Sequence, residues 1–247
     1  MIAFIIPYRD REQQKIFYEK QMTTEVMKNH TYEEDYIILF IHQQDKRLFN
    51  CGALKNIGYL VLKDLYPETY KNITMVFNDV DIMPFTAEFL DYKTSIGTIK
   101  HFYGYTHTLG GLVSIMPEDF EKINGFPNFW TWGYEDTILQ NRAQTKNLRI
   151  DRSQFYPLFD KNILMLMHSF ERVMSHSENR KITSGSNEGI KEIQNLNYTI
   201  DRSTNMVNVT SFTTATEPPK ETFIQDSRKE FYIQGPPVKL RFTKTKK

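Results

Sequence analysis

Short apolar runs alternate with amphipathic stretches over roughly the first 80 residues of the chain. Residues 2–6, 36–42 and 73–78 are almost continuously apolar and rich in β-branched and aromatic side chains, which predicts three buried strands. Between them, residues 12–28 and 53–65 carry apolar side chains at helical spacing and predict two helices. Strands that alternate with helices are typical of α/β proteins built around a mostly parallel sheet.

The second half of the chain continues this pattern with shorter elements. Strands are predicted at residues 98–103 and 111–116, a short helix near Pro117 and a longer helix at 135–145. Two further short strands are predicted within residues 195–209.

Composition fits one principal globular domain, because 40% of the 247 residues are hydrophobic and 25% are charged. We assign residues 1–200 to this domain and 201–247 to a C-terminal extension, in which Pro-Pro pairs interrupt the apolar pattern. The extension ends in a basic tail at 238–247, which we interpret as solvated. The 31 basic and 30 acidic side chains leave a net charge of +1, so no nucleic-acid partner is expected.

A single cysteine, Cys51, rules out an intrachain disulfide, so the fold does not depend on an oxidising compartment. The apolar opening of the chain is only six residues long before Pro7 and a charged segment, which is too short for a signal peptide or a membrane span. We therefore expect a protein without an integral membrane segment, in the cytoplasm or otherwise soluble inside the cell.

Polar side chains follow the first three predicted strands. Arg9 comes just after the first strand, His42 ends the second, and Asp79 and Asp81 follow the third. Ligands of parallel sheets bind beyond the carboxyl ends of the strands, so these side chains are predicted to share one crevice.

The Asp79-Val80-Asp81 segment is a candidate metal site. If the third strand continues through it, the two carboxylates point to the same side, since alternate residues of a strand share a face. Two adjacent carboxylates repel each other unless a cation lies between them, and a divalent metal can bridge them to a nucleotide diphosphate. An acidic turn that ends a strand is the simpler interpretation of the same spacing.

A second candidate for metal ligation is the segment Met165-Leu166-Met167-His168. Oxygen, nitrogen and thioether donors together favour a borderline transition ion over Mg²⁺ or Ca²⁺. A run of methionines is also typical of a hydrophobic core, and His176 is a rival ligand.

Both tryptophans of the chain, Trp130 and Trp132, precede the acidic pair Glu135 and Asp136. Aromatic faces bind sugars, and a carboxylate behind indole rings is partly desolvated, which raises its basicity toward that of a general base for a hydroxyl. Acidic residues are also favoured at a helix N-terminus, where the predicted helix at 135–145 places them. The preceding aromatic cluster favours the functional interpretation.

Taken in chain order, these blocks resemble the β-1,4-galactosyltransferase family, glycosyltransferase family 7. The order of five separate blocks makes an accidental match improbable. The blocks are Pro7-Tyr8-Arg9-Asp10-Arg11; His42-Gln43 with Phe49-Asn50 and Asn56-Ile57-Gly58; Asp79-Val80-Asp81; Gly110-Gly111 with Trp130-Thr131-Trp132-Gly133-Tyr134-Glu135-Asp136; and Met165-Leu166-Met167-His168-Ser169.

The resemblance implies a GT-A type nucleotide-diphospho-sugar transferase fold, with a mostly parallel central sheet flanked by helices. It further implies a UDP-sugar donor, Mn²⁺, a glycan or glycoprotein acceptor, and inversion at the anomeric carbon by direct displacement. Asp136 would be the catalytic base, with Glu135 placing the acceptor, and Asp81, Met165 and His168 would bind the metal. The implied donor-binding residues are Pro7, Tyr8, Arg9, Arg11, Phe49, Asp79, Thr108, Gly110, Gly111 and Trp132.

Three positions depart from the family pattern. Cys51 replaces the arginine of the family's Phe-Asn-Arg, which removes a cation from the donor site. Thr137 replaces a third acidic residue that touches the acceptor, and Thr108 stands where the family carries a larger side chain beside the donor sugar. The donor is therefore predicted only as a UDP-hexose or UDP-N-acetylhexosamine, and the acceptor, the linkage and the oligomeric state stay open.

The main hypothesis is thus a metal-dependent inverting glycosyltransferase. The alternative, motivated by Cys51 and Thr137, is a catalytically weakened UDP-sugar or carbohydrate-binding module. A glycoside hydrolase also uses two carboxylates but would leave the predicted metal ligands without a role.

Overall fold

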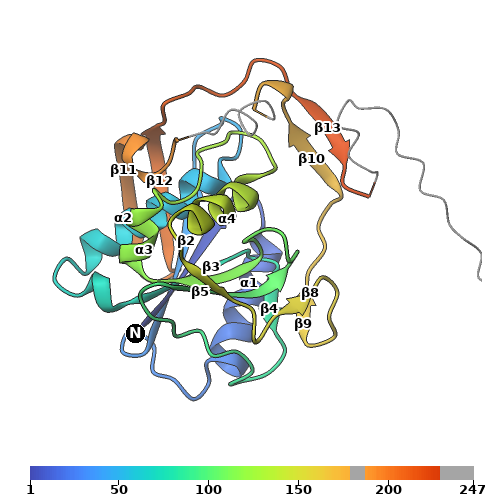
Figure 1. Ribbon diagram of the computed structural model, residues 1–247. Coiled ribbons are helices and arrows are strands. Elements are labelled where there is room, and N and C mark those ends of the chain that lie inside the picture. The colour runs from blue at the N-terminus through green and yellow to red at the C-terminus, as the bar shows by residue number, and fades with distance from the viewer. Residues whose placement is uncertain (179–186, 229–247) are drawn as a thin grey trace, which may run out of the picture.

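A nine-stranded sheet forms the centre of the computed structural model, which describes residues 1–178 and 187–228 (Figure 1). Its order is β11-β12-β2-β1-β3-β6-β5-β7, with β8 beside β5. Five strand pairs are parallel and three are antiparallel, so the predicted mostly parallel sheet is confirmed. The strands are β1 (Ile2–Tyr8), β2 (Tyr36–Gln43), β3 (Thr74–Asn78), β5 (Thr98–Gly104), β6 (Leu112–Ile115), β7 (Arg149–Asp151), β8 (Tyr156–Pro157), β11 (Gln194–Asp201) and β12 (Met206–Thr213).

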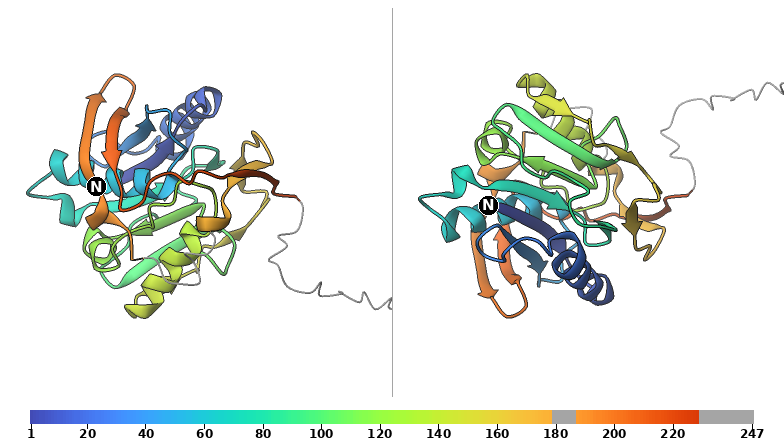
Figure 2. Two further views of the ribbon diagram at one scale, coloured as in Figure 1. Left: turned by 90° about the horizontal axis from the view of Figure 1, so that it is seen from above. Right: turned by 90° about the horizontal axis from the view of Figure 1, so that it is seen from below.

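Helices cover both faces of this sheet, because alternate residues of its central strands are apolar on both sides. In β1, Ala3 and Ile5 pack into the core beneath α2, α3 and α4, whereas Phe4 and Ile6 pack into the core beside α1. Figures 1 and 2 show α1 on one side of the sheet and the other three helices opposite. The helices are α1 (Glu12–Gln21), its π-helical continuation η1 (Met22–Val26), α2 (Cys51–Leu65), α3 (Pro117–Lys122), α4 (Glu135–Thr145), and the 3-10 turns η2 (Tyr70–Asn72) and η3 (Ile190–Glu192).

A glycine lets α2 lie directly on the sheet. A Cβ at Gly58 would stand 2.2 Å from Ile5 Cγ2, so only glycine permits this approach of helix to strand. The close packing fixes the N-terminal turns of α2, which carry Cys51 and Lys55, beside the segments that follow β1 and β3.

Two small sheets extend the central one. In the first, β4 (Ile82–Pro84) pairs with β9 (Ile163–Met165), and Ile82 faces Met165 across the pair. In the second, β10 (Glu171–Met174) pairs with β13 (Phe223–Asp226), and this pair lies apart from the central sheet (Figures 1 and 2). The first pairing brings the predicted metal segment next to the Asp79-Val80-Asp81 block.

The strands predicted within 195–209 form the hairpin β11–β12, and β12 adds in parallel to β2. The domain boundary predicted after residue 200 falls inside this hairpin, so the central sheet continues to Thr213. The basic tail at 238–247 lies outside the described residues. No helix within the described parts is long and apolar enough to span a bilayer. The cellular location stays a prediction.

Candidate active site

A cleft of about 420 Å³ opens at the carboxyl ends of β1 and β3. Its walls come from the starts of α2 and α4 and from the segment that follows β9. Eleven of the fifteen predicted site residues line it, so segments far apart in the sequence converge on one space. These eleven are Pro7, Arg9, Arg11, Phe49, Asp79, Asp81, Trp132, Glu135, Asp136, Met165 and His168.

Two predicted donor-binding side chains lie away from the cleft wall. The Tyr8 ring is buried and packs edge-on against Phe40 and His42 in the core. Thr108 lies in the loop before β6, where its carbonyl accepts a hydrogen bond of 3.3 Å from Arg152. The donor-binding roles of both residues stay predictions.

The two predicted glycines shape the cleft through their neighbours. A Cβ at Gly110 would lie 2.1 Å from Asp136 Oδ2 and 2.7 Å from its Cγ, so the missing side chain makes room for that carboxylate. Gly111 has a φ of +74°, a conformation that favours glycine, and a Cβ there would meet the Tyr103 carbonyl at 2.7 Å. The Gly-Gly pair therefore lets the β6 loop approach the start of α4.

The Asp79-Val80-Asp81 segment is a turn that follows β3, as the simpler interpretation of its spacing held, and it does not continue the strand. β3 ends at Asn78, and the Ile82 amide donates to the Asp79 carbonyl across the turn at 3.1 Å. The buried Asn78 side chain replaces the missing strand partners, donating to the carbonyls of Asp79 at 2.7 Å and Ile82 at 2.8 Å. Both aspartates nevertheless line the cleft, as the sequence predicted.

The predicted metal ligands lie together on one side of the cleft. The Leu166 amide donates to the Asp81 carbonyl at 2.8 Å, which fixes Met165 beside the aspartate turn, and His168 follows on the same wall. Burial and the neighbouring Asp79 charge raise the pKa of Asp81 to about 6. A bound cation would offset the electrostatic repulsion between these two carboxylates.

These residues fit a transition ion such as Mn²⁺, since they offer a carboxylate, a thioether and an imidazole. The described residues contain no cluster of three His, Cys, Asp or Glu side chains arranged for a metal. The rival ligand His176 stacks on Phe223 with ring centroids 4.5 Å apart, whereas His168 lines the cleft.

The acidic pair opens α4, whose first turn forms another part of the cleft wall. Gly133, with a φ of 123°, and Tyr134, with a φ of 70°, turn the chain so that Glu135 and Asp136 occupy the first helical turn. Glu135 is buried and accepts a 3.1 Å hydrogen bond from the Gly133 amide. The helix N-terminus favours both acidic side chains electrostatically, which agrees with the simpler interpretation of the sequence. Asp136 also lines the cleft.

The environment of Asp136 gives its carboxylate unusual basicity. Burial raises the pKa of Asp136 to about 7, with Lys55 opposing the rise and the charges of Glu135 and Asp79 adding to it. Burial also raises the pKa of Glu135. A base with a pKa near neutrality is well suited to removing a proton from a hydroxyl.

Lys55 is a cleft residue that sequence reasoning missed. Its side chain is only 4% exposed, and its Nζ lies 3.7 Å from Asp136 Oδ1 and 3.8 Å from Asp79 Oδ1. The ammonium also lies 4.7 Å from the centre of the Phe126 ring. Although burial opposes this charge, the surrounding acidic groups raise the pKa of Lys55 well above its ordinary value. The sequence feature that could have identified it is a lysine within a helical stretch that is otherwise largely apolar.

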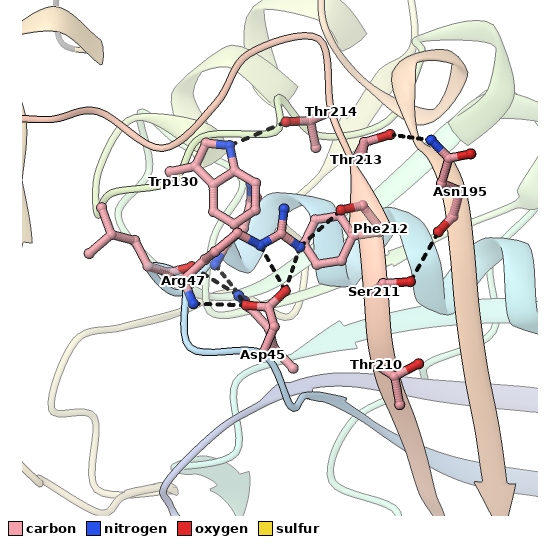
Figure 3. A network of polar contacts seen from close by, with 12 residues as sticks. Asp45, Arg47, Trp130, Asn195, Thr210, Ser211, Phe212, Thr213 and Thr214 are labelled. Atoms are coloured by element: carbon pink, nitrogen blue, oxygen red, sulfur yellow. Dashed lines mark hydrogen bonds and ion pairs between the residues drawn. The ribbon is translucent and has the colours of Figure 1, made fainter.

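The two tryptophans have different surroundings. Trp130 is 1% exposed and stacks on Phe212 at 5.4 Å, and Arg47 lies 4.5 Å from the centre of its ring (Figure 3). Its indole nitrogen donates to Thr214 Oγ1 at 3.2 Å. Trp132 is 41% exposed and lines the cleft. Trp130 therefore supports the cleft wall. Trp132, with the Arg172 guanidinium carbon 5.6 Å from the centre of its ring, is the more exposed indole in the cleft.

Another residue that sequence reasoning missed is Glu178. It is buried, and its carboxylate accepts hydrogen bonds from the Trp130 amide at 2.9 Å and from Thr131 Oγ1 at 2.5 Å. It fixes the loop that carries both tryptophans.

Arginines supply positive charge on the donor side. Arg9 donates to the Arg47 carbonyl at 2.7 Å, and its guanidinium carbon lies 5.2 Å from the centre of the Phe49 ring. Arg11 and Arg172 also line the cleft. Cations and an aromatic ring in one wall are suited to the phosphates and the base of a nucleotide.

The family model described as the N-terminal region of glycosyl transferase group 7 matches residues 1–92, and the model described as the N-terminal domain of galactosyltransferase matches residues 92–169. The chain belongs to glycosyltransferase family 7.

Relatives include human beta-1,4-galactosyltransferase 4 (Homo sapiens), which is 30% identical over 61% of this chain and 44% of its own length. The Caenorhabditis elegans xylosylprotein 4-beta-galactosyltransferase is 26% identical over 81% of this chain and 71% of its own length. The chain thus spans less than half of the human relative.

Solved structures confirm the GT-A type fold. The catalytic domain of Drosophila beta1,4-galactosyltransferase 7 in complex with xylobiose has a TM-score of 0.66 at 18% identity, covering 87% of this chain and 94% of that one. A mutant of the same enzyme, in complex with manganese, UDP-Gal and xylobiose, has a TM-score of 0.63 at 19% identity, with the same coverage.

Proposed function

We propose that this protein is a metal-dependent inverting glycosyltransferase that moves a hexose or N-acetylhexosamine from a UDP-sugar to a hydroxyl of a glycan or glycoprotein. One observation carries the proposal. A single cleft joins the predicted metal ligands around Asp81 to the basic carboxylate of Asp136, with Trp132 beside them.

In the proposed reaction, Asp136 accepts the proton of the acceptor hydroxyl as that oxygen bonds to the anomeric carbon of the donor. The bond from the anomeric carbon to the diphosphate breaks in the same step, which inverts the configuration. The raised pKa of Asp136 makes its carboxylate a stronger base than an exposed aspartate. Much of the rate would come from holding hydroxyl and anomeric carbon in line.

Positive charge around the donor would stabilise the diphosphate leaving group. Mn²⁺ bound by Asp81, Met165 and His168 would offset the negative charge that develops on the diphosphate. Arg9 and Arg11 line the same wall, where they would bind phosphate oxygens. Phe49, beneath Arg9, offers a surface on which the uracil base can stack.

UDP-galactose is the donor to test first, because the relatives are named galactosyltransferases and the Drosophila structure contains UDP-Gal with manganese. Xylose-terminated saccharides are the first acceptors to test, since xylobiose is present in both Drosophila structures. UDP-N-acetylhexosamines are included because the family resemblance predicts room for a larger donor sugar at Thr108, although Thr108 lies away from the cleft wall.

The test is a screen of UDP-sugars with Mn²⁺, with and without saccharide acceptors, read out as released UDP and as glycosylated product. The proposal requires product with at least one donor, and loss of product in Asp136→Asn. Tight binding of UDP with no product from any donor and acceptor would favour the binding-module alternative.

A further inference from the structure

The position of Lys55 has a physical cost that needs an explanation. An ammonium removed from water loses hydration that only neighbouring anions or dipoles can replace. Both of its ion pairs, at 3.7 and 3.8 Å, are longer than a hydrogen bond between such groups. Among the described residues, Asp136 Oδ1 is buried without a hydrogen-bond partner. Lys55 therefore acts on Asp136 mainly through its charge and not through a hydrogen bond.

The charges that face Asp136 come from three elements. Glu135 lies in α4, Asp79 follows β3, and Lys55 lies in α2 with Cys51 one turn before it. Lys55 is the only cation among these groups. Without it, three neighbouring carboxylates would repel one another, and one of them would take up a proton.

We propose that Lys55 is a positioning residue for the transfer reaction, whose ammonium holds the Asp136 carboxylate ionised and directed into the cleft while linking it to Asp79 on the donor side. This inference rests on the proposed function, and it assigns the residue that makes Asp136 available as a base at neutral pH. A neutral side chain at position 55 would leave the cleft intact but keep Asp136 protonated.

The geometry makes Lys55→Met a clean perturbation. Methionine is similar in length, stays buried against the Phe126 ring and removes only the charge. Loss of an opposite charge at this distance raises the titration midpoint of a carboxylate by about one to three pH units. From a midpoint near 7, a shift of this size should lower turnover at pH 7 by about fivefold or more, and the loss should be several times smaller at pH 9.

The experiment has two arms. The first records the pH dependence of kcat for UDP release with Mn²⁺ and a UDP-sugar in wild type, Lys55→Met and Lys55→Arg. The second labels aspartate with ¹³C at the carboxylate and follows the Asp136 resonance, identified by its absence in Asp136→Asn, as pH is varied. Lys63→Met is the matched control, because Lys63 lies on the same helix but pairs with Glu121 outside the cleft.

The proposal expects a higher titration midpoint of Asp136 in Lys55→Met and a matching shift in the pH at which kcat falls on the acid side. Lys55→Arg, which restores the charge, should bring the midpoint back toward the wild-type value, and Lys63→Met should behave as wild type. An unmoved midpoint, or a loss of activity that is equal at pH 7 and pH 9, would overturn it. Lys55→Gln replaces Lys55→Met if the methionine variant does not fold. If wild type turns over no UDP-sugar, the proposed function fails, and the titration arm still decides the role of Lys55.

Discussion

The variant Gly110→Ala offers a test of the base that removes no polar group from the cleft. The added methyl would lie 2.1 Å from Asp136 Oδ2, whereas real Cβ atoms essentially never approach other heavy atoms within 3.0 Å. The carboxylate must therefore retreat by roughly 1 Å, a displacement that costs about a hundredfold in rate when it affects a reacting group. That factor corresponds to about 2.7 kcal/mol of activation free energy.

The backbone gives no other reason for a loss, because Gly110 lies outside the left-handed region that penalises alanine. We expect kcat for UDP release to fall about a hundredfold, while calorimetry shows unchanged binding of UDP and Mn²⁺. In an Asp136→Asn background, Gly110→Ala should lower kcat hardly at all, because the side chain that it displaces can no longer act as a base. Full activity of Gly110→Ala, or an equal loss of kcat in both backgrounds, would show that the variant does not act by displacing a catalytic Asp136 carboxylate.

Further predictions concern the metal, the pH dependence and the tryptophans. Asp81→Ala should lower transfer by more than about a hundredfold and abolish its response to Mn²⁺; activity that survives EDTA would contradict this. Because Asp136 must be ionised and its pKa is raised to about 7 by burial, kcat/KM should fall as pH drops below 7; a flat profile down to pH 5 would exclude Asp136 as the base. Trp130→Ala should destabilise the fold by about 3–5 kcal/mol in denaturant unfolding. Trp132→Ala should keep Tm close to wild type and raise KM, and the opposite pattern would reverse the roles assigned to the two indoles.

The fold was largely predictable because burial on both faces leaves a strong pattern. The strands at the centre of the sheet are continuous apolar runs, and the helix predicted at 135–145 agrees with α4. The paired strands near residue 200 were also predictable, but their membership of the central sheet was not. Parallel addition of β12 to β2 joins segments more than 160 residues apart, and no local pattern encodes it.

The site residues were predictable where the groups that act together are close in the sequence. The aspartate turn, the acidic pair and the Met165 to His168 segment could each be found from spacing alone. Lys55 could not, because its carboxylate partners are distant in the sequence and its own surroundings are apolar. The sequence left the aspartate segment open between a strand and a turn, because the hydrogen bonds that the Asn78 side chain supplies to the turn have no signature in the local pattern.

The loss of a family cation at position 51 has a counterpart in the structure. Cys51 and Lys55 are one helical turn apart in α2, and both line the cleft. The positive charge next to the acidic pair is thus present, carried by a different position. This arrangement supports an active transferase over a weakened binding module.

In the proposed mechanism, Asp81 and Asp136 serve one reaction in one cleft. The most direct measurement compares Asp136→Asn and Asp81→Ala with wild type in two assays, glycosyl transfer from a UDP-sugar and calorimetric binding of UDP with Mn²⁺. We predict that both variants lose glycosyl transfer. Asp136→Asn should keep metal-dependent UDP binding, and Asp81→Ala should lose it. Transfer at the wild-type rate by either variant would contradict the proposed mechanism.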